Sequence, residues 1–205
     1  MVLRMSYDPQ SLLTEIDSVL SKVSPSRHMV MLRQVTDLFV AHAEAWTPEQ
    51  ATVFDAVIKR LAKDIGPRGQ AELARMLAAM DAAPLDTIGA LSNSDNITVS
   101  GPILEKSKLL KDSDLVGIAK SKGQGHLLAI AARSEIADTV TDVLVDRGDK
   151  AVKHRVIANE GAQFSEFGFA RLISDCSRDK ALAAIVAKRD DIPAELQPFL
   201  QVALG

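Results

Sequence analysis

A repeat with a period of 28 residues is the feature that most constrains the fold of this chain. When the sequence is shifted by this period, apolar positions in its second half superpose on one another. The superposed sets are Ile136 with Phe164 and Ile192, and Leu144 with Leu172 and Leu200. A unit of this length is typical of two short helices joined by a turn, and such a unit cannot bury both of its apolar sides alone. The period therefore predicts a stack of helix pairs, a solenoid, over residues 84–205.

The composition favours helices along the whole chain. The 205 residues include 28 alanines and 23 leucines, which are strong helix formers, whereas aromatic residues make up only 4%. Apolar side chains also recur at helical spacing in the first half of the chain. The clearest stretches are Val35, Leu38, Phe39 and His42, followed by Phe54, Val57, Ile58, Leu61, Ala62 and Ile65. We therefore predict an all-α chain in which residues 8–83 form an N-terminal helical bundle packed on the solenoid.

Several helix boundaries can be predicted from short motifs. Thr47-Pro48-Glu49-Gln50 combines a capping hydroxyl, a proline at the first helical position and a glutamine that can complete a capping box. Ile65-Gly66-Pro67 indicates the end of that helix and the start of the next, and Ala83-Pro84 indicates another break. No glycine-, serine- or proline-rich linker separates the two halves, so we expect one continuous structural unit.

Two arginines recur two periods apart at the predicted ends of helices. Arg133 and Arg189 could donate to helix C-terminal carbonyls and to a carboxylate of the adjacent repeat, which would form a structural ladder. Alternatively, they could face a concave surface and clamp an acidic partner. Asn159 allows the same two interpretations, as an inter-repeat hydrogen-bonding residue or as a polar contact for a ligand.

A weaker copy of the repeat around Ile97 and Leu104 lies too far before Ile136 for the period, so we predict an insertion from Lys106 to Gly123. The lysines of this segment, with His126 just after it, are the candidate partner-binding residues: Lys106, Lys108, Lys111, Lys120, Lys122 and His126. The local excess of positive charge is small, because Glu105, Asp112 and Asp114 lie among the lysines.

Six segments of the second half support a family resemblance. They are Pro102 to Ser107, Leu109 to Leu115, His126 to Arg133, Val140 to Asp149, Ala158 to Ala162 and Arg189 to Pro193. Together they resemble the bacterial domain of unknown function 2336, and similar pieces upstream, at Leu38-Phe39 and Phe54 to Val57, extend the resemblance to about residues 27–200. The resemblance implies a HEAT-like helical-repeat protein without an established activity, and it carries over no catalytic residues.

The motifs that usually indicate enzymes are absent. The sequence has no Gly-x-Ser-x-Gly elbow, His-Glu-x-x-His pair, Walker A sequence or calcium loop. None of the four histidines has a histidine or cysteine three or four residues further on, and Cys176 is the only cysteine, so we expect no metal site and no cofactor. Gly123-Gln-Gly125 is more typical of a tight turn before a helix than of a phosphate loop.

Charge argues against nucleic acid as the main partner. The net charge is −3, and neither half of the chain is basic. No apolar stretch is long enough to span a bilayer, and the first thirty residues lack a signal-peptide pattern, so we expect a cytoplasmic protein. We predict a noncatalytic protein–protein interaction module. A homodimer, a HEAT-like nucleic-acid-binding protein and an unrecognised enzyme remain alternatives.

Overall fold

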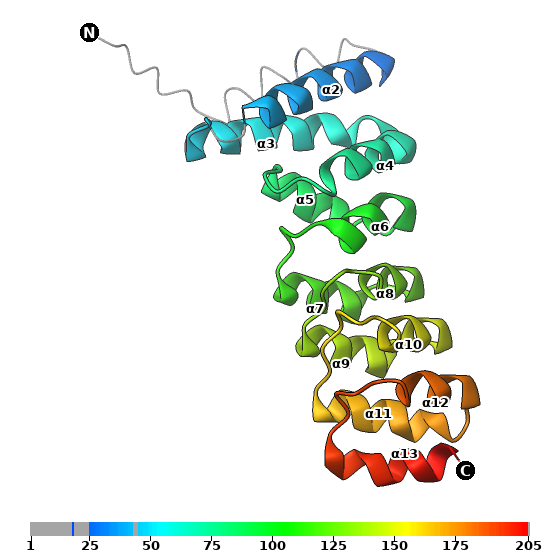
Figure 1. The fold of residues 1–205 in the computed structure, drawn as a ribbon. Helices are drawn as coiled ribbons and strands as arrows, with labels where there is room; N and C mark the ends of the chain where they lie inside the picture. The colour runs from blue at the N-terminus through cyan, green and yellow to red at the C-terminus, as the bar shows by residue number, and fades with distance from the viewer. Residues whose placement is uncertain (1–17, 19–24, 43–44, 205) are drawn as a thin grey trace. The chain divides into compact units, whose positions relative to one another are not determined.

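The computed structural model describes residue 18 and residues 25–42 and 45–204, and parts of the predicted N-terminal bundle lie outside these ranges. The regular elements of the described residues are all helices, with no strand among them, which confirms the predicted all-α class (Figure 1). None of the described helices has the length and apolar character needed to cross a membrane. The chain divides into two compact units, of which unit 1 ends at Ile103 and unit 2 begins at Leu104. The predicted break at Ala83-Pro84 lies within unit 1, immediately before a helix.

The described part of unit 1 contains four helices and part of a fifth, and the first three of them are the longest in the described part of the chain. The helices are α2 (Pro25–Ala41), α3 (Pro48–Lys63), α4 (Gly66–Leu77), α5 (Leu85–Ser92) and the first part of α6 (Ile97–Lys106). Helix α3 lies at the centre of the unit, because it packs against α2, α4 and α5.

Both predicted boundaries of α3 are confirmed. The hydroxyl of Thr47 accepts a hydrogen bond from the backbone N–H of Gln50 at 3.3 Å, and the Gln50 side chain accepts one from the N–H of Thr47 at 3.0 Å. After α3, Gly66 adopts a φ of +65°, which a residue with a Cβ rarely adopts, and the chain turns there into α4.

The predicted apolar stripe of α2 is partly wrong. Phe39 is buried, but Leu38 is 47% exposed and His42 is also exposed. The buried side of the helix instead carries Leu32, Thr36 and Phe39, at spacings of four and three residues. His42 therefore lies at the surface, where its Nδ1 is 3.3 Å from the carbonyl oxygen of Leu38.

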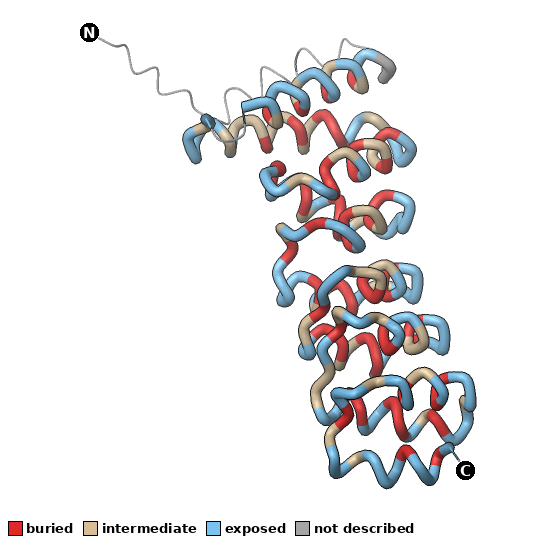
Figure 2. Tube along the Cα trace, viewed as in Figure 1, coloured by how far each residue is buried: buried red, intermediate tan, exposed pale blue. Residues whose placement is uncertain are grey.

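Unit 2 is a stack of helix pairs in two layers (Figure 1). Helices α7, α9, α11 and α13 pack in sequence in one layer, and α8, α10 and α12 pack in sequence in the other. Figure 2 shows the buried residues gathered where neighbouring helices of the unit face each other. The helices are α7 (Asp112–Ser121), α8 (Gln124–Ile130), α9 (Asp138–Arg147), α10 (Lys150–Ile157), α11 (Glu166–Cys176), α12 (Lys180–Val186), the short 3₁₀ helix η1 (Ala194–Leu196) and α13 (Gln197–Leu204).

The predicted repeat register corresponds to equivalent places in this stack. Helix α9 begins at Asp138, α11 at Glu166 and η1 at Ala194, so these three elements start one full period apart. Of the six apolar positions that the register superposes, five are buried and one, Phe164, is half-buried. The ring of Phe164 lies beneath the guanidinium of Arg189, with the central carbon 4.9 Å from the ring centre.

The predicted insertion from Lys106 to Gly123 is wrong. This segment contains α7, which pairs with α8 as α9 pairs with α10. The distance along the chain from the start of α7 at Asp112 to the start of α9 at Asp138 is shorter than the period. A comparison at a fixed shift of one period therefore places α7 and α9 out of register. The segment is a regular member of the stack.

Candidate functional site

The candidate lysines do not form one patch. Lys106 is the last residue of α6 and Lys108 follows it, whereas Lys120 is in the last turn of α7 and Lys122 lies just beyond it. Helix α7 has ten residues, so about 15 Å of helix separates the two pairs. Lys111 lies between them and uses its backbone N–H to bind the carboxylate of Asp114 at 3.0 Å.

His126 differs from the lysines because it is buried. It lies in the first turn of α8 and is only 6% exposed, whereas Lys106, Lys108, Lys111 and Lys120 are exposed and Lys122 is half-buried. His126 therefore offers little surface to a partner.

Arg133 connects two successive levels of unit 2. It follows α8, and its guanidinium is half-buried. Its Nη1 donates to the carbonyl oxygen of Leu104 at 2.8 Å, and its Nη2 donates to that of Ser107 at 2.9 Å. Burial lowers the pKa of this guanidinium, and the carboxylate of Asp112 partly opposes the shift. Arg133 still carries its positive charge, because arginine does not lose its proton in proteins.

Asn159 and Arg189 make the corresponding contacts at the next two levels. The side-chain amide of Asn159 donates to the carbonyl oxygens of Ala131 at 3.1 Å and Arg133 at 2.6 Å. Arg189 donates through Nη1 to the carbonyl of Asn159 at 3.0 Å and through Nη2 to that of Ala162 at 3.1 Å. We call Arg133, Asn159 and Arg189 the ladder residues. In each case the acceptors lie 26 to 30 residues earlier in the chain.

Gly161 lies in the loop after α10, at the point where this loop contacts the loop after α8. Its carbonyl accepts from the N–H of Ile136 at 3.1 Å, and the N–H of Gln163 donates to the carbonyl of Ile136 at 2.9 Å. A Cβ at Gly161 would overlap the carbonyl oxygen of Ser134. Glycine is therefore needed for the close approach of these two loops, rather than for a special backbone angle.

A polar hollow of about 480 Å³ opens beside Arg133, and we call it the Arg133 hollow. It lies where the loops after α6, α8 and α10 come together. Its lining contains three positive and three negative side chains, and of these only Arg133 is half-buried while the others are exposed. The lining residues are Glu105, Lys106, Lys108, Asp112, Arg133, Ser134, Glu135, Ile136, Ala137, Gly161 and Gln163.

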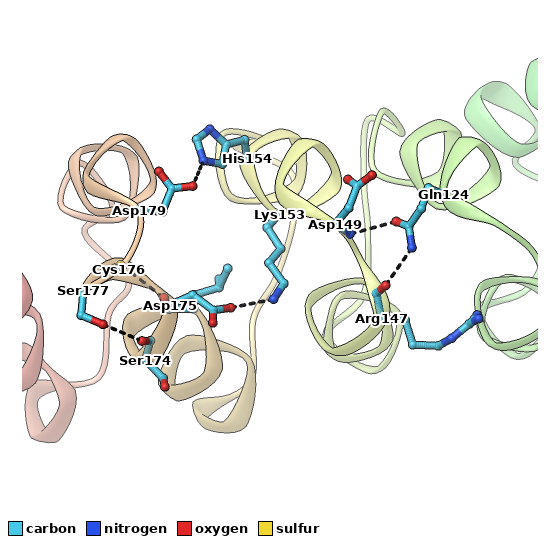
Figure 3. A network of polar contacts seen from close by, with 11 residues as sticks. Gln124, Arg147, Asp149, Lys153, His154, Ser174, Asp175, Cys176, Ser177 and Asp179 are labelled. Atoms are coloured by element: carbon cyan, nitrogen blue, oxygen red, sulfur yellow. Dashed lines mark hydrogen bonds and ion pairs between the residues drawn. The ribbon is translucent and has the colours of Figure 1, made fainter.

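A second group of polar contacts lies between α10, α11 and α12 (Figure 3). The ammonium of Lys153 is 2.6 Å from the carboxylate of Asp175, and Nε2 of His154 is 2.7 Å from the carboxylate of Asp179. The hydrogen bond with His154 is the main reason that the pKa of Asp179 lies far below its usual value. These side chains are already paired with one another, so they link levels of the stack rather than present free charges.

Cys176 lies in the same region and is fully buried. Its thiol donates to the carbonyl oxygen of Leu172 at 3.2 Å. Burial, followed by the nearby carboxylates of Asp175 and Asp179, raises the pKa of the thiol to about 11. The interpretation of Cys176 as a small packed residue at the end of a helix therefore fits its surroundings. Among the described residues, no group of three or more His, Cys, Asp or Glu side chains is arranged to hold a metal ion.

The sequence indicated Lys106, Lys108 and Arg133 of the hollow but not the loops that shape it. Ser134, Glu135, Gly161 and Gln163 were not among the candidates, because no motif marks them. The usable signal is positional: each of them lies within four residues of a ladder residue. Loops that follow equivalent helices in a stack lie on the same edge, so residues just after a ladder position line that edge.

In unit 2, polar side chains thus join successive helix pairs of an all-helical structure. Residues 99–200 match the family of uncharacterised proteins conserved in bacteria known as the domain of unknown function 2336, and the chain belongs to this family. The predicted family is thus confirmed, although the match covers less of the chain than the expected residues 27–200. No curated protein and no solved structure matches the chain.

Proposed function

We propose that this protein is a noncatalytic interaction module, in which a HEAT-like solenoid binds another protein at the Arg133 hollow. The mixed charge of the hollow is the observation that supports this proposal most directly. A partner protein can place carboxylates against Lys106 and Lys108 and basic groups against Glu105, Asp112 and Glu135.

The same mixture of charges disfavours a nucleic-acid partner. A phosphate backbone repeats one sign of charge and is bound by grooves in which lysines and arginines dominate. In the Arg133 hollow, three carboxylates would face that backbone. We also propose that the protein acts in the cytoplasm, where reducing conditions suit its single free thiol.

The test is affinity capture from lysate of the native cells, with the full chain as bait. The variant carries Lys106→Glu and Lys108→Glu, and the control carries Arg155→Glu, because Arg155 is an exposed residue of α10 outside the hollow. We expect at least one protein to be retained by the wild type and the control, lost by the double variant and unaffected by nuclease.

Three outcomes would contradict the proposal. Equal retention by all three baits would place the contact elsewhere. Loss of the captured protein after nuclease treatment would favour nucleic acid as the partner. Capture of nothing but the cell's own copy of this protein would indicate that the chain binds a second copy of itself.

A further inference from the structure

We propose that the Arg133 hollow recognises a single acidic side chain of the partner protein, and that the carboxylate pairs with the guanidinium of Arg133. This inference rests on the proposed function and specifies what the hollow binds. Arg133 and Arg189 have equivalent places in the stack but different surroundings.

The guanidinium of Arg189 binds a carboxylate of its own chain. Besides its two carbonyl partners, it binds the carboxylate of Asp191, with Nε donating to Oδ1 at 2.7 Å and Nη2 donating to Oδ2. This fork of two parallel hydrogen bonds is the strongest way in which arginine binds a carboxylate. The hydrogen bonds with Asp191 raise the pKa of Arg189 and lower that of Asp191.

The guanidinium of Arg133 also donates to two backbone carbonyls, but no carboxylate of the described residues binds it. Its Nε is shielded from water and has no hydrogen-bond partner among the described residues. Glu135 has the same sequence offset from Arg133 as Asp191 has from Arg189, yet its side chain is exposed and does not bind the arginine. A shielded N–H without an acceptor is unfavourable, so an acceptor that reaches Nε gains more than it would at an exposed site.

The Arg133 hollow provides the space for this missing carboxylate. Arg133 is the only half-buried charge in the lining, and charges attract more strongly where water is partly excluded. Lys106 and Lys108 add positive charge around it. Nε is shielded from water, and the exposed side chains of the lining can rotate to admit a carboxylate.

The acidic residues of the lining limit which partner segments fit. Glu105, Asp112 and Glu135 would repel a run of acidic residues, but they can pair with basic residues on either side of one acidic residue. The preferred ligand is therefore a segment in which one aspartate or glutamate lies between lysines or arginines. A polyacidic tail or a phosphate group fits less well.

The experiment is an NMR titration of the full chain that follows the Nε–Hε signals of Arg133 and Arg189. One probe is the peptide Lys-Ser-Glu-Ser-Lys with acetylated and amidated ends, and its control has glutamine in place of glutamate. We expect the glutamate peptide to shift the Arg133 signal and leave the Arg189 signal in place. The glutamine peptide should bind at least about tenfold more weakly, because it cannot form the charged fork.

Two variants and one control variant locate the site. Lys106→Gln with Lys108→Gln should weaken binding of the glutamate peptide about fivefold, whereas Arg155→Gln should leave it unchanged. Glu135→Asp gives Arg133 the acidic residue that Arg189 has at the same offset. We expect its carboxylate to occupy the fork, to weaken peptide binding about tenfold and to leave the melting temperature undiminished.

Any of three results would overturn the inference. In the first, the Arg133 signal does not move when the glutamate peptide is added. In the second, the glutamine peptide or sodium phosphate shifts the signal as much as the glutamate peptide does, and in the third, Glu135→Asp binds the glutamate peptide as tightly as the wild type. Failure here while the wild type still captures a protein would reject the carboxylate site and keep the interaction module. Peptide binding at Arg133 without any captured protein would keep the site and reject the module.

Discussion

The side-chain amide of Asn159 donates a hydrogen bond to the backbone carbonyl oxygen of Arg133, so two ladder residues of successive levels contact each other directly. Arg189 repeats the relationship by donating to the carbonyl of Asn159. The polar contacts between levels thus form a connected series. Each ladder residue is a donor through its side chain, and Arg133 and Asn159 are also acceptors through their backbones.

Replacing Asn159 with alanine tests this series. The substitution removes the donor to Ala131 and Arg133 and the acceptor for the N–H of Gly161, which leaves half-buried polar groups unpaired. We expect the free energy of unfolding to fall by about 1–3 kcal/mol. Urea denaturation followed by far-UV circular dichroism measures it, with the exposed neighbour Glu160→Ala as the control. An equal effect of the two substitutions would contradict a structural role for Asn159.

A second prediction concerns the close approach at Gly161. Gly161→Ala forces the new Cβ against the carbonyl oxygen of Ser134, so the loops after α8 and α10 must separate. We expect a loss of about 1–3 kcal/mol, the usual range for overpacking. The matched control is Gly117→Ala in α7, where a Cβ meets nothing within 4 Å and should stabilise the helix slightly. A melting temperature for Gly161→Ala at or above the wild-type value would show that the approach is not restrictive.

The thiol of Cys176 should be unreactive in the folded protein. With a pKa of about 11, only about one thiol in a thousand is ionised at pH 8, and the side chain is also buried. We expect a colorimetric disulfide reagent to label it slowly in buffer and rapidly in denaturant. The positive control is Ser177→Cys, which places a thiol at the exposed next position. Rapid labelling of native Cys176 would contradict its burial.

The lowered pKa of Asp179 predicts that the stability of the fold depends on pH. Its pKa is lowered in the folded state, so the ionised carboxylate stabilises the fold above its unfolded pKa of about 4, and this stabilisation is lost as the pH falls below that value. Asp179→Asn removes the charge but retains a residue that can cap α12. The wild type should therefore be more stable than Asp179→Asn at pH 6, and the difference should shrink towards pH 3. Asp146→Asn, at an exposed site in α9, should show no such trend.

The sequence predicted those features that depend on neighbouring residues. The capping box at Thr47 involves residues three positions apart, so it could be recognised before the fold was known. The start of α5 could not be explained in the same way. Its backbone N–H groups at Asp86 and Thr87 bind the buried carboxylate of Asp55, at 2.6 Å and 2.9 Å. Asp55 lies in α3, more than thirty residues earlier, and only the packing of α3 on α5 brings it there.

The candidate site was predictable in part for a similar reason. Lys106, Lys108 and Arg133 are distinguished in the sequence by their charge or register, and the structure brings all three to one hollow. The pairing of α7 with α8 was missed because its spacing to the next pair is shorter than the period that revealed the repeat. The hollow itself depends on the meeting of three loops, which no single stretch of sequence encodes.

The direction of the ladder also bears on how the protein is made. Every donor side chain comes later in the chain than its acceptor carbonyls, by 26 to 30 residues. A ribosome therefore completes each acceptor before it adds the residue that binds it. Each new helix pair emerges next to a finished surface with carbonyls in place, so unit 2 can assemble one level at a time during translation.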